Sequence, residues 1–347
     1  MRAFIPLLSA LLILLSLTSP RASGAEQASA ATPGREKVLR AGIIGLDTSH
    51  VIAFTKVLND PKAGPEVAGV KVVAAFPGGS PDFPPSRDRV EKFTQDIRGM
   101  GVEIVPSISA LLEKVDVVLL ESVDGRVHLE QVKPVFAAGK PVFIDKPLAG
   151  SLAQAIAIAE LGEKHKAKWF SSSSLRYGEG LAKVKGDEKL GKVVGCATWG
   201  PCEIQPTHPD LFWYGIHGVE MLYSVMGTGC ESVSRVHTGG ADVVTGVWQG
   251  GRVGTYRGVR GGKGGFGAVV FGEKASTPFA EGGGYKPLLV EVVKFFKTGK
   301  PPVPAAETVV LFAFMEAADE SKRQGGKPVT IESVMAKARE GAKELLK

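Results

Sequence analysis

The stretch RAGIIGLDTSHVIAF, residues Arg40–Phe54, decides the fold class. An apolar segment, Val38–Ile44, runs into Gly45 and is followed at once by residues with helical spacing. Strand, glycine turn and helix in this order form the first unit of a nucleotide-binding α/β fold. A phosphate-binding turn would read G-x-G-x-x-G, but Asp47 and His50 stand at the second and third glycine positions.

Strand and helix signals alternate after this first unit. Strands are predicted at residues 38–44, 70–76, 102–106, 116–122 and 141–145, with helices at 49–59, 88–100, 108–115 and 128–139. Continuous runs of Val, Ile and Leu separated by single helices predict a parallel sheet that is covered on both faces. The N-terminal part is therefore expected to be a doubly wound α/β domain.

The pattern changes after Pro147. Helices are predicted at residues 151–166, 286–298 and 305–324, and strands at 193–200, 232–238, 241–248, 252–259 and 267–272, with a further strand starting at 169. Short glycine-rich connections between consecutive strands favour a mostly antiparallel sheet, with a hairpin turn at 258–267. We expect an α+β domain at 149–330 and a C-terminal helix at 331–347.

The first residues have the features of a secretory signal. A positive start is followed by the apolar run 3–17 and by small residues before Ala25, and the run is too short to span a membrane comfortably. Residues 1–25 are predicted to be a signal peptide and 26–37 a linker, so the protein would be exported to the periplasm or secreted. The alternative is that the run remains as an anchor.

Charge and cysteine content argue against a nucleic-acid-binding protein and against a disulfide-rich one. Removal of residues 1–25 takes away two arginines and no acid, so the net charge falls from +6 to +4. No basic run accompanies this mild excess, which argues against a nucleic-acid partner. Cys196, Cys202 and Cys230 show no metal spacing and favour buried free thiols over a disulfide framework, with one disulfide as the alternative.

The first loop that could bind a ligand is the turn after the first strand. Thr48 and Ser49 are neutral helix caps that suit a phosphate. The Asp47 carboxylate would accept the same N–H groups and place its charge where a pyrophosphate would lie. The alternative is a self-capped helix without a nucleotide. The second strand also ends without the acid that binds an adenosine ribose, since the nearest acid is Asp82.

Two further regions carry polar groups. Lys146 follows the fifth strand, where a lysine can orient a hydroxyl or relay a proton, or simply be solvated. In the segment 199–222, His217 and Glu220 are three residues apart and would share a helix face, which allows acid–base work. An H-x-x-E pair is also a weak metal signal. The predicted substrate-binding residues are His208, Asp210, Trp213 and Arg176.

Three segments resemble one known family. GIIG at 42–45, SVDGRVHLEQVKPVFAAGKPVFIDKPLAGS at 122–151 and GIHGVEMLYSVMG at 215–227 are similar, in this order, to the Gfo/Idh/MocA family, which includes glucose–fructose oxidoreductase and inositol dehydrogenase. The resemblance covers residues 38–327. It implies an NAD(P)-binding Rossmann-like domain at 38–148, followed by a domain whose open, mostly antiparallel sheet often forms homo-oligomers.

The resemblance also implies roles for individual residues. Lys146 matches the family's catalytic lysine, and His217 matches its acid/base histidine. Ser122 and Asp124 would line the cofactor, and Gly45 would be the first glycine of the fingerprint. Where the family often has an aspartate four residues before the histidine, this chain has Trp213.

The sequence thus favours an exported oxidoreductase that acts on a sugar or polyol. Lys146, His217 and Glu220 would be catalytic. The NAD or NADP site would comprise Gly45, Asp47, Thr48, Ser49, His50, Ser122, Asp124 and Lys146. Two alternatives remain: a redox-inactive lyase, hydrolase or epimerase that uses the histidine cluster, with or without a metal, and a non-catalytic carbohydrate-binding protein.

Overall fold

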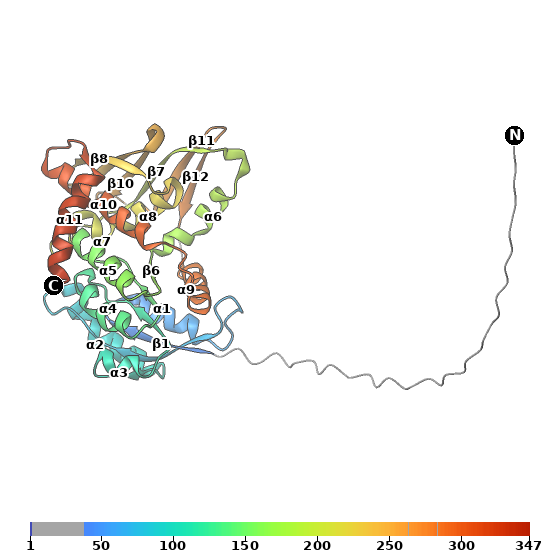
Figure 1. Ribbon diagram of the computed structural model, residues 1–347, viewed down its shortest axis with the longest axis vertical. Helices are drawn as coiled ribbons and strands as arrows, with labels where there is room; N and C mark the ends of the chain where they lie inside the picture. Colours follow the sequence, from blue (N-terminus) through green and yellow to red (C-terminus); the bar gives the residue numbers. More distant parts are fainter. Residues whose placement is uncertain (2–37, 263, 283) are drawn as a thin grey trace. The chain divides into compact units, whose positions relative to one another are not determined.

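The computed structural model describes residue 1 and residues 38–262, 264–282 and 284–347 (Figure 1). The predicted signal segment and linker, apart from Met1, lie outside the described residues. Within the described ranges, no helix is both long enough and apolar enough to cross a membrane.

The N-terminal sheet is parallel and has six strands. Its strands are β1 (Leu39–Ile44), β2 (Val70–Phe76), β3 (Glu103–Ile104), β4 (Val117–Leu120), β5 (Val142–Ile144) and β6 (Trp169–Ser171). They lie in the order β3-β2-β1-β4-β5-β6, so the strand order reverses between β1 and β4. The predicted doubly wound parallel sheet is confirmed. Ligands in such sheets bind beyond the carboxyl ends of the strands at this reversal.

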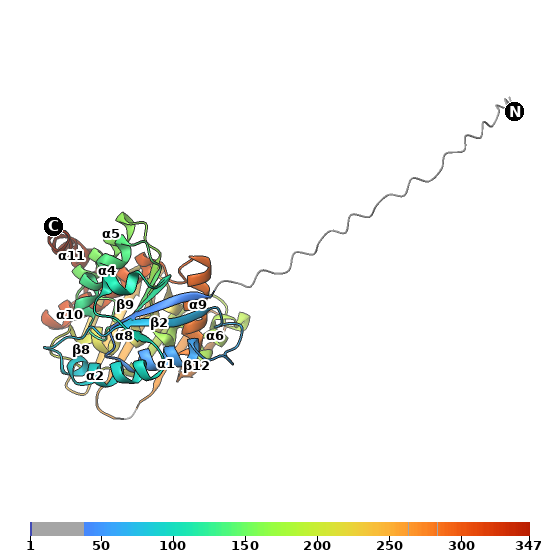
Figure 2. The same cartoon turned by 90° about the horizontal axis from the view of Figure 1, so that it is seen from below.

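Helices cover both faces of this sheet (Figure 2). One layer contains α3 (Ile108–Leu112), α4 (His128–Ala137) and α5 (Leu152–Lys164), and the other contains α1 (Ser49–Leu58), α2 (Pro84–Gly99) and α9 (Lys286–Thr298). Successive strand residues face opposite layers, since Ile44 packs with the first set and Ile43 with the second. Both strand faces are therefore buried, which explains why the strands are apolar throughout.

The sheet extends beyond the domain boundary that the sequence predicts at 148/149. α5 and β6 follow that boundary but belong to the parallel sheet, as β6 pairs with β5. α9 lies far along the chain and still packs against this sheet, since Phe295 of α9 contacts Phe170 of β6. The apolar face of α9 belongs to the same buried cluster as residues of α1 and α2. The described residues from 38 onwards form one compact unit.

The second sheet has seven strands in the order β12-β11-β7-β10-β9-β8-β13. They are β7 (Val193–Pro201), β8 (Cys230–His237), β9 (Ala241–Trp248), β10 (Arg252–Val259), β11 (Phe266–Gly272), β12 (Ser276–Glu281) and β13 (Val329–Thr330). The strand pairings are antiparallel except for β7 with β10, so the predicted mostly antiparallel sheet is confirmed. α8 (Gly215–Met226) packs on β7 and β10, and α10 (Ala305–Arg323) packs on β8.

The predicted hairpin turn at 258–267 is wrong. β10 and β11 do not pair with each other, because β7 lies between them. The glycine-rich segment therefore crosses the end of β7.

Three further helices complete the described chain. They are α6 (Glu179–Lys185), α7 (Asp210–Trp213) and α11 (Ile331–Leu345), the last of which packs on α5. All three cysteines are free thiols, and Cys196 and Cys202 are buried.

Candidate functional site

A cavity of about 350 Å³ lies at the carboxyl edge of the parallel sheet, between that edge and helices α7 and α8. The segments after β1, β4 and β5 supply one wall, and residues near the start of α8 supply the other. The lining residues are Thr48, Ser49, His50, Arg89, Val123, Lys146, Ser174, Leu175, Trp213, Tyr214, His217, Phe266, Gly282 and Tyr285. The fold thus brings the predicted Lys146 and His217, 71 positions apart in the sequence, to one cavity.

The turn after β1 requires glycine at position 45. Gly45 has a φ of +90°, and a Cβ placed there would lie 2.3 Å from the Oγ of Ser122 and 2.5 Å from its backbone nitrogen. Such a contact is too short for any side chain to occupy. Gly45 therefore lets the turn lie directly against the loop that follows β4.

Asp47 does not cap α1 as the sequence suggests. Its carboxylate is fully buried and accepts hydrogen bonds from Ser86 Oγ at 2.6 Å and from the backbone N–H of Val123 at 2.9 Å. Thr48 is the N-cap, and its hydroxyl accepts from the N–H of His50. Burial raises the pKa of Asp47, which favours the neutral form. The carboxylate is thus directed into the protein, away from the first turn of α1.

His50 and Lys146 lie on the same side of the cavity. His50 Nδ1 is 2.5 Å from the carboxylate of Asp145, the residue that follows β5. Burial alone would raise the pKa of Asp145, but His50 and Lys146 bring it below its ordinary value. Lys146 Nζ lies 5.9 Å from the ring centres of Trp213 and Tyr214. Burial, with a smaller contribution from Arg89, lowers the pKa of Lys146.

His217 faces this group from α8. Its Nδ1 is 2.7 Å from Ser173 Oγ, and its ring contacts those of Tyr214 and Phe266. Burial, reinforced by the charges of Lys146 and His50, holds the pKa of His217 well below its ordinary value. The imidazole is therefore neutral near pH 7, as a proton acceptor must be.

Glu220 and Arg176 do not line this cavity. Arg176 Nε donates to Glu220 at 2.6 Å, and its Nη1 donates to Glu307 at 2.5 Å. Glu220 also accepts from the N–H of Ser173, the residue that contacts His217. Both predicted residues are therefore engaged in a buried ion pair that supports the loop under His217.

The remaining predicted substrate residues also have protein partners. Asp210 pairs with Arg235 at 2.8 Å and with Lys322 at 2.6 Å. His208 is buried, with Nε2 at 3.3 Å from Asp124. Of the four predicted substrate-binding residues, the cavity contains Trp213 alone.

The loop after β4 is fixed by its own contacts. Ser122 Oγ donates to Gln131 at 2.8 Å, and Asp124 is paired with Arg126 at 2.7 Å. His128, which begins α4, has its ring nitrogens 2.8 and 3.1 Å from the carbonyl oxygens of Ser122 and Leu148. Val123, between the two predicted cofactor residues, is the part of this loop that reaches the cavity.

Sequence reasoning missed Arg89, Tyr285 and Phe266 as lining residues. Arg89 lies on α2, where an arginine gives no signal that distinguishes it from surface charge. Tyr285 precedes α9 and contacts the ring of His50, while Phe266 begins β11. All three come from elements whose approach to the cavity depends on long-range packing.

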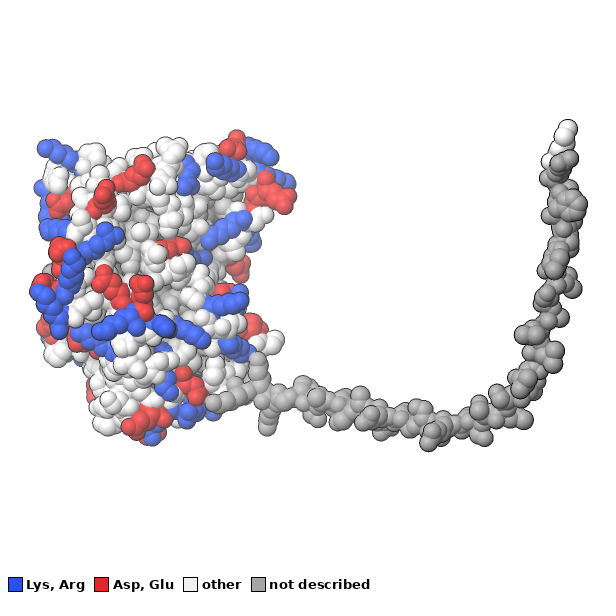
Figure 3. Space-filling model, in the orientation of Figure 1, with Lys and Arg blue, Asp and Glu red and all other residues white. Residues whose placement is uncertain are grey.

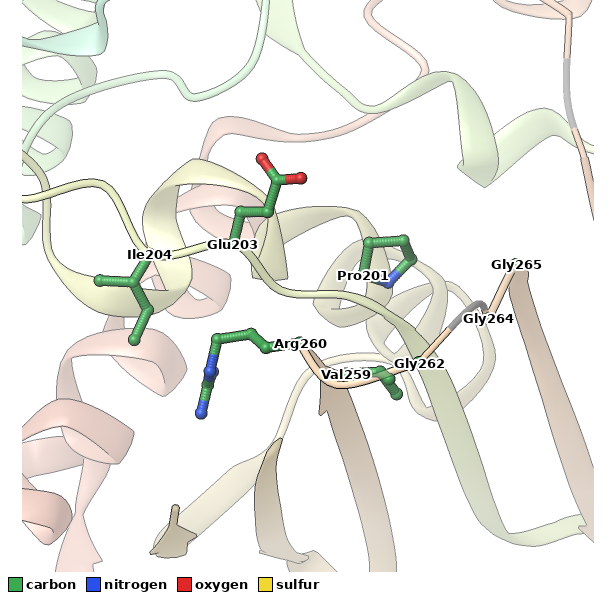
Figure 4. Close-up of a pocket in the computed structure, with 8 residues that line it drawn as sticks. All are labelled: Pro201, Glu203, Ile204, Val259, Arg260, Gly262, Gly264 and Gly265. Carbon is green, nitrogen blue, oxygen red and sulfur yellow. The ribbon is translucent and has the colours of Figure 1, made fainter. Parts of the chain in front are cut away.

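A larger hollow of about 900 Å³ lies near the ends of β7 and β10 (Figure 4). It is lined by Pro201, Glu203, Ile204, Val259, Arg260, Gly262, Gly264 and Gly265. Arg260 is already paired with Asp242. None of the predicted site residues lines this hollow. In the part of the chain that the structure describes, no group of three or more His, Cys, Asp or Glu residues could hold a metal.

The dinucleotide that the resemblance implies fits the residues at the sheet edge. Because Asp47 is turned inward, Thr48 and Ser49 would hold a phosphate at the start of α1. Lys146 and Trp213 would lie beside the nicotinamide. A second hollow of about 430 Å³ at the ends of β2 and β3 suits an adenine ring, since its lining residues are Phe76, Pro77, Gly78, Ile104, Val105 and Pro106.

Comparisons with known proteins agree with this architecture. A protein from Thermotoga maritima described as a probable dehydrogenase has a TM-score of 0.69 at 20% identity, over 85% of this chain and 100% of that one. A scyllo-inositol dehydrogenase from Lactobacillus casei, solved with NAD(H) and scyllo-inositol, has a TM-score of 0.71 at 13% identity, over 85% and 100%. No curated protein matches the chain.

Residues 83–172 match the model of the Gfo/Idh/MocA oxidoreductase family, described as having an NAD-binding Rossmann fold. This segment runs from the start of α2 to the end of β6 and contains Lys146. The match confirms the resemblance seen in the sequence. Residues 83–172 of this chain are thus similar to the Gfo/Idh/MocA oxidoreductase family.

Proposed function

We propose that the protein is an NAD(P)-dependent oxidoreductase that acts on a hydroxyl group of a sugar or polyol. One observation carries this proposal: Lys146 and His217 line a single cavity, together with Trp213 and the first turn of α1. The inositol dehydrogenase among the structural neighbours acts on a polyol, which supports this class of substrate.

In this proposal the chain's own residues manage the proton of the hydroxyl group. Donation of Nδ1–H by His217 to Ser173 would leave Nε2 free to accept that proton. The ammonium group of Lys146 would bind the same hydroxyl oxygen and stabilise negative charge on it. The aromatic face of Trp213 would pack against C–H groups of the substrate. The bound nicotinamide would supply the hydride acceptor or donor.

Two substitutions test these roles. We expect Lys146→Gln and His217→Asn each to lower kcat at least about 100-fold, the range for a lost proton-transfer or oxyanion group. Dinucleotide binding and the thermal midpoint should change little. Lys133→Gln is the matched control, since Lys133 is a partly exposed lysine that pairs with Glu130 on α4. Unchanged turnover in either test variant would contradict the assignment.

A redox-inactive enzyme on the same cavity is the second candidate. One observation favours it: the N–H of Leu46, within the fingerprint turn, already donates to Pro77 O at 2.7 Å. This leaves fewer N–H groups in the turn for a phosphate. Conversion of a sugar by cofactor-free protein, with no change in nicotinamide absorbance when cofactor is added, would establish this alternative.

We further propose that the protein forms a homo-oligomer through the second sheet. Phe271, Val253 and Val247 occupy one row across β11, β10 and β9, on either side of Gly195 of β7. All three are 38–44% exposed. Sedimentation equilibrium would show a dimer or larger assembly, and a monomer would contradict the proposal.

Export also stays a proposal, to be tested by N-terminal sequencing of protein recovered outside the cytoplasm.

A further inference from the structure

The side chains around the Lys146 cavity have an unbalanced charge. Two cationic side chains, Arg89 and Lys146, line it together with two histidines, of which His217 is neutral near pH 7, whereas the lining residues include no Asp or Glu. The nearest carboxylate, Asp145, is buried behind the wall and is engaged by His50 at 2.5 Å. The face of the molecule drawn in Figure 3 mixes acidic and basic residues. The cavity lining, by contrast, includes Arg89 and Lys146 but no carboxylate.

Arg89 differs from three other arginines that are partly or fully buried. Arg126, Arg176 and Arg235 each pair with at least two carboxylates. Arg89 is half-buried, donates from Nε to the carbonyl of Pro85, and forms no ion pair with any residue in the described ranges. The remaining guanidinium N–H groups are thus available to a ligand in the cavity.

Arg89 and Lys146 line the same cavity of about 350 Å³. The positive charge of Arg89 also contributes to the lowered pKa of Lys146. Lys146 interacts with the buried carboxylate of Asp145 and Arg89 with that of Asp47, but neither carboxylate lines the cavity. An anionic ligand in the cavity would lie directly against both cations. The anion would then be bound next to the reacting hydroxyl group. Thr48 and Ser49, where a cofactor phosphate would bind, line the same cavity, so the test below separates a cofactor phosphate from a substrate carboxylate.

We propose that the substrate is a polyhydroxy carboxylate, a sugar acid whose carboxylate binds Arg89 while its hydroxyl group lies at Lys146 and His217. This inference rests on the proposed function and narrows its substrate class. The planar fork of an arginine matches the two oxygens of a carboxylate, which supplies orientation as well as charge.

The test compares neutral sugars with their acids. The purified full-length chain is titrated calorimetrically with matched pairs of aldoses and the corresponding uronates and aldonates, with a sugar phosphate as a further ligand. Arg89→Gln is the test variant. Arg87→Gln is the control, because Arg87 lies on the same helix, is exposed and pairs with Asp88. We expect at least one acid to bind about 10- to 100-fold more tightly than its neutral partner. Arg89→Gln should abolish that difference, and Arg87→Gln should retain it.

Several outcomes would overturn the inference. One is a panel in which no acid binds better than its neutral partner. Another is a preference for acids that survives in Arg89→Gln. If Arg89→Gln binds NAD(P) more weakly but still prefers sugar acids over neutral sugars, the arginine would be assigned to a cofactor phosphate instead. Preferential binding of the sugar phosphate over every carboxylate would refute the sugar-acid class. If an acid binds through Arg89 but no hydride transfer occurs with any dinucleotide, the inference holds and the proposed function fails.

Discussion

Replacement of Asp47 by alanine should destabilise the protein strongly. The carboxylate accepts two hydrogen bonds in a buried position, from Ser86 Oγ at 2.6 Å and from the N–H of Val123 at 2.9 Å. Alanine would leave two donors without an acceptor, at a cost of about 1–3 kcal/mol each. Part of that cost is recovered because a desolvated carboxyl group disappears. We therefore expect a loss of about 2–4 kcal/mol of unfolding free energy.

Urea unfolding followed by circular dichroism measures this loss. At an m-value of about 3 kcal/mol per molar urea, the midpoint of Asp47→Ala should fall by about 1 M with the slope unchanged. Asp47→Asn is the control, since its amide oxygen can still accept from Val123 and its NH₂ group can donate to Ser86. Asparagine should cost less than about 1 kcal/mol. Equal urea midpoints for the alanine and asparagine variants would refute the conclusion that the hydrogen bonds of Asp47 link α2 to the segment after β4.

Three other predictions concern Gly45, Asp319 and His217. Gly45→Ala should destabilise the protein by about 2–4 kcal/mol in urea unfolding, because the new Cβ would collide with the backbone of Ser122; a loss below about 0.5 kcal/mol would contradict the geometry. Burial raises the pKa of Asp319 from 3.8 to about 7. The native state therefore holds a proton that the unfolded chain releases, so the stability from this group falls as pH rises from 3.8 towards about 7. Asp319→Asn should flatten that part of the stability profile, and an unchanged slope would exclude the effect. Finally, because the pKa of His217 lies well below 6.5, kcat/KM should show no loss on acidification to pH 6.5; a decline centred at pH 6.5 would contradict this.

The parallel sheet could be predicted because its strands are buried on both faces. Continuous apolar runs such as 70–76 and 116–122 then stand out against amphipathic helices. The predicted boundary at 148/149 places β6 in the second domain, because the regular alternation of strand and helix signals changes after Pro147. β12 was missed because Pro278 and polar neighbours weaken its pattern, as expected for a strand at the edge of a sheet.

Long-range pairing explains the errors in the second sheet. The sequence between β10 and β11 is short and glycine-rich, which is typical of a hairpin. Whether another strand lies between two neighbours in the chain depends on β7, about 60 residues earlier. Nothing local to the turn carries that information.

In the candidate site, too, some residues can be identified from the local sequence, while the roles of others depend on partners far away in the chain. Lys146 and His217 were predicted because short motifs surround them. Glu220 was predicted from its spacing to His217, yet its function depends on Arg176, 44 positions away in sequence. Residue type likewise predicts that Asp47 opposes a phosphate, whereas its partners on α2 and after β4 hold the carboxylate inside the protein. Residue type and spacing thus identify reactive groups, while their availability depends on partners that the fold supplies.

Titration of the purified full-length chain with NAD⁺, NADH, NADP⁺ and NADPH tests the central claim most directly. A parallel sample is unfolded first to release any dinucleotide that was carried through purification. The account predicts saturable, micromolar binding of at least one dinucleotide, or release of a bound one, with the inward-facing Asp47 leaving Thr48 and Ser49 to the phosphate. No heat of binding and no released cofactor would contradict it, and the cavity at Lys146 and His217 would then have to work without a nicotinamide.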